Sequence, residues 1–152
     1  MTPFVTITED GIAREPISRG DYTVTDGTHA QAFWLPEIFE QLRVIASLPE
    51  GWDSYGAPTP EFHKVEAAAN LISCLADDPN LPKPYVNPTR DGGVQFEWES
   101  EAKYFELEIK AERAATFFYS DEDKHIEETG EVFENESLAV VLELIHRVVS
   151  NT

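Results

Sequence analysis

Hydrophobic and polar positions follow two different periods along the chain, and this predicts both helices and strands. Apolar side chains recur every three or four residues, the spacing of one helix face, in three segments: 36–47, 59–76 and 136–149. Period-two alternation or β-forming composition predicts strands in four segments: 94–99, 104–109, 114–120 and 125–129. The order of these segments favours an α+β fold, with an antiparallel sheet of about four strands and about three helices packed on one face.

The ends of these segments carry turn and capping residues. Pro36 suits the first turn of its helix, and Thr59 followed by Pro60 is typical of an N-cap and first helical position. Residues 81–90, together with the neighbouring Pro79, are so rich in proline that the stretch is expected to be extended without forming a central strand. Residues 1–33 are weakly patterned, with short strands expected at 4–8 and 22–25. We therefore expect an N-terminal arm or hairpin over 1–33 and a single domain over 34–152.

The two alternating strands separate apolar from acidic side chains. Val94, Phe96 and Trp98 point to one face, and Phe105, Leu107 and Ile109 match them on the neighbouring strand. The opposite face then receives the polar set: Gln95, Glu97, Glu99, Tyr104, Glu106 and Glu108. Like charges opposed across strands are destabilising, so such a face is either well solvated or meets something positive. Lys103 and Lys110 are expected to neutralise part of it.

Charge strengthens this interpretation. The chain has 152 residues, 29 of them acidic and 11 basic, for a formal net charge of −18. Residues 91–152 contain 16 acids and 5 bases, so −11 of that charge lies there. A field of this sign repels nucleic acid and anionic membranes, and it favours a basic protein surface as partner. No apolar run reaches the length of a membrane span, the first residues lack a secretory-signal pattern and Cys74 is a single cysteine, so a cytoplasmic location is expected.

The sequence contains none of the common catalytic motifs. It lacks a phosphate-binding P-loop, a G-x-G-x-x-G segment, an H-E-x-x-H pair and a G-x-S-x-G elbow. No cofactor is predicted. Carboxylate pairs on the acidic face keep a small enzyme or a metal-binding domain as an alternative, and His63 with Glu66 and Asp53 is the other metal candidate.

Two loops combine aromatic residues, glycine and aspartate in an unusual way. One is Gly51-Trp52-Asp53-Ser54-Tyr55-Gly56-Ala57, and the other leads from Asp91-Gly92-Gly93 into a strand ending Glu97-Trp98. Over about residues 48–110 the chain resembles a group of small uncharacterised bacterial and phage proteins that share a G-W-D-x-Y-G-A segment and a D-G-G-x-x-x-E-W strand. The resemblance implies a bacterial or phage origin and no particular chemistry.

The residues of the first loop have two interpretations. Trp52 and Tyr55 either fill the gap between helices and sheet or contribute to a partner-binding site, since both types are enriched at interface hot spots. Asp53 is expected to accept hydrogen bonds from backbone N–H groups of its own loop.

These patterns favour a non-enzymatic acidic protein-binding module, in particular an inhibitor or antitoxin-like protein that occupies a basic, nucleic-acid-facing surface of its partner. Its predicted binding residues are Glu97, Glu99, Glu106, Glu108, Tyr104, Trp52, Asp53 and Tyr55. The alternatives are a small enzyme or metal-binding domain on the acidic face, and a homo-oligomeric structural protein such as a homodimer.

Overall fold

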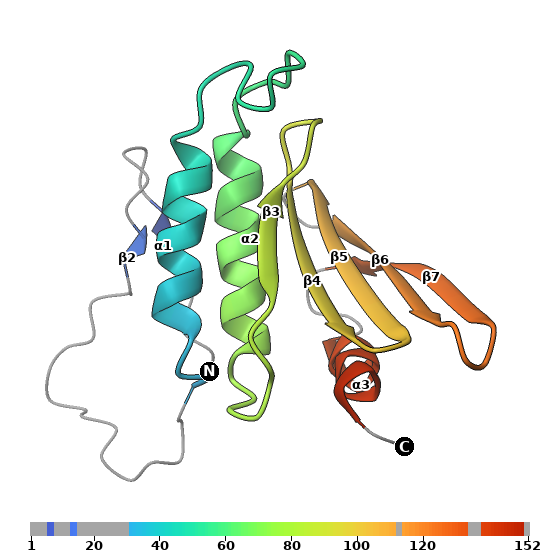
Figure 1. Ribbon diagram of the computed structural model, residues 1–152. Coiled ribbons are helices and arrows are strands. Elements are labelled where there is room, and N and C mark those ends of the chain that lie inside the picture. Colours follow the sequence, from blue (N-terminus) through green and yellow to red (C-terminus); the bar gives the residue numbers. More distant parts are fainter. Residues whose placement is uncertain (1–5, 8–12, 15–30, 112–113, 134–137, 151–152) are drawn as a thin grey trace, which may run out of the picture.

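The computed structural model describes residues 6–7, 13–14, 31–111, 114–133 and 138–150, and everything below concerns these residues (Figure 1). The main sheet contains β3 (Tyr85–Pro88), β4 (Val94–Ser100), β5 (Lys103–Ala111), β6 (Ala114–Asp121) and β7 (Ile126–Phe133). These strands pair in chain order, and every pair is antiparallel. The helices are α1 (Leu35–Ala46), α2 (Phe62–Leu75) and α3 (Leu138–Val149).

The predicted α+β class is confirmed, with five strands in the main sheet where about four were expected. The additional strand is β3, which lies in the proline-rich stretch and pairs with β4 at one edge of the sheet. An edge position suits this sequence because proline has no N–H to donate to a second neighbour. The expectation that the stretch is extended but not a central strand is therefore confirmed.

The three helices bury one face of the sheet. In Figure 1, α1 and α2 run side by side, while α2 and α3 both pack against β4 and β5. The strands contribute Phe96, Phe105 and Leu107 to the core, and each is fully buried. Two buried indoles also form hydrogen bonds with backbone carbonyls at the edge of this core. Trp34 donates from Nε1 to the Leu81 carbonyl at 2.8 Å. Trp98 donates likewise to the Pro82 carbonyl at 2.8 Å.

The start of α2 differs from the prediction of a Thr59 cap and Pro60 as first helical residue. The helix begins at Phe62, and the residue before it, Glu61, is extended with φ −73° and ψ 126°. The Glu61 N–H donates to the Gly92 carbonyl at 2.9 Å, in the turn between β3 and β4. This tertiary hydrogen bond fixes Glu61 in an extended conformation, so the helix starts later than local composition suggests.

Residues before α1 also contact the domain. Ala32 is buried, and its N–H donates to the Ala76 carbonyl at 2.8 Å, although the sequence placed the domain boundary after residue 33. Further upstream, β1 (Thr6–Ile7) and β2 (Ala13–Arg14) form an antiparallel pair that contacts α2 and α1, respectively. The strand expected at 22–25 lies outside the described residues.

Among the described helices, none has both the length and the apolar character needed to cross a bilayer.

Candidate protein-binding face

The sheet face opposite the helices, here called the open face, collects polar side chains from all five strands. Directly opposed residues of an antiparallel pair project from the same face, so the register assigns each residue to a side. The open face contains Tyr85, Asn87, Gln95, Glu97, Glu99, Tyr104, Glu106, Glu108, Thr116, Phe118, Ser120, Glu127, Thr129 and Glu131. Lys110, at the irregularity in β5, joins this face through its ion pair with Glu108. The predicted gathering of Glu97, Glu99, Tyr104, Glu106 and Glu108 on one uncovered face is therefore confirmed as a placement.

Two carboxylates stand directly opposite each other at the centre of this face. Glu97 on β4 is the register partner of Glu106 on β5, and both side chains are partly buried. Each receives one hydrogen bond from a neighbour two residues away on its own strand. Gln95 Nε2 donates to Glu97 Oε1 at 2.5 Å, and the Tyr104 hydroxyl donates to Glu106 Oε2 at 2.8 Å. These hydrogen bonds partly offset the repulsion between the two opposed carboxylates.

Tyr104 links the acidic centre to an aromatic neighbour. Burial raises the pKa of Tyr104 far above its ordinary value, and its hydrogen bond to Glu106 and the charges of Glu106, Glu97 and Glu99 raise it further. The phenol therefore stays protonated and acts as a donor at any physiological pH. Its ring lies 6.2 Å from that of Phe118, centroid to centroid, so the acidic face has an aromatic centre.

Among the described residues, Lys110 is the cation that lies on the open face. Its ammonium lies 2.6 Å from Glu108 Oε2 and 3.9 Å from Asp91 Oδ2. Lys103, which was expected to neutralise the same face, lies on the other side, where its ammonium donates to the carbonyls of Arg147 and Ser150, each at 3.0 Å. That expectation is wrong because the end of α3 offers carbonyls with the negative end of the helix dipole.

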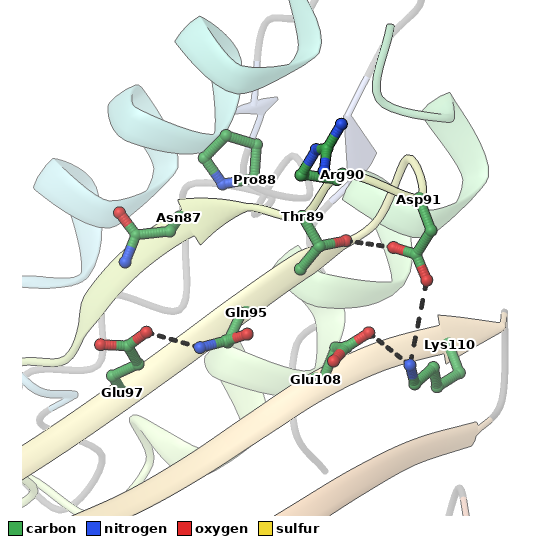
Figure 2. A pocket seen from close by; sticks show the side chains of 9 residues that line it. All are labelled: Asn87, Pro88, Thr89, Arg90, Asp91, Gln95, Glu97, Glu108 and Lys110. Atoms are coloured by element: carbon green, nitrogen blue, oxygen red, sulfur yellow. Dashed lines mark hydrogen bonds and ion pairs between the residues drawn. The ribbon is translucent and has the colours of Figure 1, made fainter. Parts of the chain in front are cut away.

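An open depression of about 540 Å³ lies where the β3–β4 hairpin meets this face (Figure 2). Its lining consists of Asn87, Pro88, Thr89, Arg90, Asp91, Gln95, Glu97, Glu108 and Lys110. In Figure 2, Glu97 and Glu108 approach it from β4 and β5, and Lys110 lies between Glu108 and Asp91. The Asp91 carboxylate accepts a hydrogen bond from the Thr89 hydroxyl, which keeps its pKa below the usual value.

The Trp-Asp loop, residues 51–57, is fastened to the same hairpin by Asp53. One oxygen of Asp53 accepts the N–H groups of Tyr55 at 2.9 Å and Ala57 at 3.0 Å. The other binds Nε of Arg90 at 2.7 Å. The Ala57 N–H contributes most to holding the pKa of Asp53 below its ordinary value, followed among the lowering groups by the Tyr55 N–H and Arg90. The expected role of Asp53 within its loop is confirmed, whereas Arg90 was not anticipated.

The aromatic residues of this loop behave differently from the prediction that they fill the gap between helices and sheet. Tyr55 is 81% exposed, so for this residue the interpretation is wrong. Its ring lies under the Arg90 guanidinium, 5.8 Å from the centroid. Trp52 is partly buried and donates from Nε1 to the Pro58 carbonyl at 3.0 Å. Loop composition alone gives no signal of these directions. Trp98, in contrast, enters the core as expected.

Two acidic residues of the open face were not anticipated, namely Glu127 and Glu131 on β7. Glu127 and Glu131 alternate with Thr129, which assigns all three to one face. The strand was predicted to end at Thr129, whereas β7 continues to Phe133, so Glu131 was left out.

Among the described residues, no group of three or more His, Cys, Asp or Glu side chains is arranged to hold a metal ion. Comparison of the chain with protein-family models, curated proteins and solved structures finds no match.

Proposed function

We propose that the protein is a non-catalytic acidic module that places its open face on a basic surface of another protein. The observation that carries the proposal is the opposed pair Glu97 and Glu106, with Glu99, Glu108 and the β7 acids around it and Lys110 as the only cation placed among them in the described part of the chain. A basic partner would convert this repulsion into attraction, so the arrangement is more favourable in a complex than alone.

The composition of the face supports protein rather than small-molecule recognition. The carboxylates lie on three strands, β4, β5 and β7, and Tyr104 with Phe118 of β6 supplies an aromatic contact of the kind found at binding hot spots. Carboxylates repeat about 6.7 Å apart along β4 and along β5, and the opposed Glu97 and Glu106 are one strand spacing of about 4.8 Å apart, which concentrates negative charge at the centre of the face. We further propose that the partner surface normally faces nucleic acid, which would make the protein an inhibitor or an antitoxin-like protein.

The test compares two variants of equal charge in the capture of a basic partner. The double variant Glu97→Gln/Glu106→Gln removes two charges from the open face while keeping side-chain shape and one acceptor oxygen in each side chain. The matched control, Glu50→Gln/Glu122→Gln, removes two charges from exposed residues elsewhere. Immobilised chain should retain a basic protein from a lysate of the organism that encodes it, and that protein should lose nucleic-acid binding when the chain is added.

The open-face variant should lose this capture while the control keeps it, and about 1 M salt should release the partner because the Debye length falls to about 3 Å. Equal capture by both variants, or capture unchanged in high salt, would contradict the proposal. If the chain captures only itself, the homodimer alternative is favoured instead.

A further inference from the structure

The two outer edges of the main sheet differ in their capacity to pair with another strand. Thr89 donates its N–H inward to the Gly93 carbonyl, and successive residues of a strand direct their backbone groups to alternate sides. The backbone groups of Tyr85 and Asn87 therefore point to β4, and the outward positions are Val86 and Pro88 in β3 and Pro84 just before it. Because two of these three are prolines, β3 offers almost no outward N–H group to a further strand.

The β7 edge has no such protection. Glu122 donates its N–H to the Ala102 carbonyl, on the β5 side of β6. Because successive residues direct their backbone groups to alternate sides, the backbone groups of Asp121 point to β7. Asp121 is the register partner of Ile126 on β7. Along β7, the residues that face β6 are thus Ile126, Glu128, Gly130 and Val132. The residues between them direct their N–H and C=O groups away from the sheet: Glu127, Thr129 and Glu131.

The same three residues belong to the open face, which determines what a further strand would meet. Glu127 and Glu131 are exposed and share this face with Thr129. A strand paired to β7 would place alternate side chains directly opposite these carboxylates, at Cα distances of about 5.5 Å. No backbone of the described residues pairs with this outer edge.

We propose that β7 receives an extended segment of the partner as an additional strand, in which lysine or arginine alternates and faces Glu127 and Glu131. This inference rests on the proposed function and specifies the partner: a basic segment in β conformation rather than a helix or a flat basic surface. A second copy of the chain is disfavoured as occupant. Antiparallel self-pairing centred on Thr129 would place Glu127 of each copy opposite Glu131 of the other, and opposed like charges are destabilising.

The test uses the full chain and a short synthetic peptide in which lysine and threonine alternate. Binding should protect from hydrogen exchange the outward amides of Glu127, Thr129 and Glu131, measured residue by residue by NMR. The inward amides of Glu128 and Gly130 should change little, because they already donate to β6. The same peptide with N-methyl groups on the amides that would face β7 should bind roughly fivefold more weakly for each blocked hydrogen bond.

A charge test complements the backbone test. Glu127→Lys/Glu131→Lys should abolish binding of the lysine peptide, whereas Glu122→Lys/Asp123→Lys, the same change in net charge on the adjacent exposed turn, should retain most of it. Binding without protection of the outward amides, or equal binding of the N-methylated peptide, would overturn strand addition and leave the proposed function standing. Protected amides with binding insensitive to salt would contradict the proposed function instead. Protection that appears in the chain alone as its concentration rises would identify a second copy as the occupant and overturn the inference.

Discussion

The opposed carboxylates Glu97 and Glu106 make a quantitative prediction about the stability of the isolated chain. In this register their Cβ atoms are about 4.5–5.5 Å apart. Two unit charges about 5 Å apart repel by about 0.8 kcal/mol at the dielectric constant of water and by about 3 kcal/mol at an effective value near 20. Both side chains are only partly buried, and measured cross-strand charge effects are about 0.2–1 kcal/mol, so we expect the repulsion to be about 0.5–1 kcal/mol.

A single substitution would not measure this repulsion cleanly. Glu97→Gln also weakens the charge-assisted hydrogen bond from Gln95, and Glu106→Gln weakens the one from Tyr104, each by up to about 1 kcal/mol. A double-mutant cycle cancels these separate losses. Glu97→Gln should be more favourable by about 0.5–1 kcal/mol when residue 106 is glutamate than when it is glutamine, because only the first background offers a repulsion to relieve.

The free energies of unfolding come from urea denaturation of the four proteins, followed by tryptophan fluorescence since Trp34 and Trp98 are buried. A control cycle pairs Glu97 with Glu131, which lies on the same face three strands across and two residues along, about 16 Å away, and should show no coupling. The coupling between Glu97 and Glu106 should shrink in about 1 M NaCl. A coupling of zero or opposite sign at low salt would refute the view that the open face is strained by its own charge.

Three further outcomes test the fold and the Trp-Asp loop. Gly93→Ala should destabilise by about 1–3 kcal/mol in urea denaturation, because a Cβ there would lie 2.8 Å from the Ile109 carbonyl oxygen, which is backbone and cannot easily yield. Trp34→Phe should cost about 1–3 kcal/mol by leaving the buried Leu81 carbonyl without its indole donor, and a smaller loss in the same assay would mean that water replaces it. Asp53→Asn should lower the thermal midpoint at pH 7. Since folding depresses the pKa of Asp53, its contribution to stability is present above the unfolded pKa of about 3.9 and is lost as the pH falls through the folded pKa. The thermal midpoints of variant and wild type should therefore converge in acid.

The strand faces were predictable because their signal is local. Alternation over 94–99 and 104–109 assigns each side chain to a face without knowledge of the partner strand, and the register then places Glu97 and Glu106 as expected. The proline-rich segment was also interpretable, since missing N–H groups restrict it to an edge wherever it pairs.

The sequence-based predictions failed where contacts between distant segments determine the conformation or the partner of a residue. The Glu61 N–H is taken by Gly92, about thirty residues further along the chain, so the helix cannot begin where Thr59 and Pro60 suggest. Lys103 alternates as a strand residue, yet only the position of α3 reveals that its ammonium binds helix carbonyls. Arg90 gains its meaning from Asp53 in a distant loop, and no local pattern contains that pairing.

The prolines of β3 also determine which assemblies the sheet can build. Growth into a filament requires that one edge of each molecule joins a different edge of the next, and here such a chain would have to join β7 to β3. With Pro84 and Pro88 directed outward, β3 offers that junction only the Val86 N–H as a donor, so repeated head-to-tail stacking is disfavoured. The β3 edge therefore ends the sheet on its own side, and strand addition to β7 does not propagate from one molecule to the next through β3.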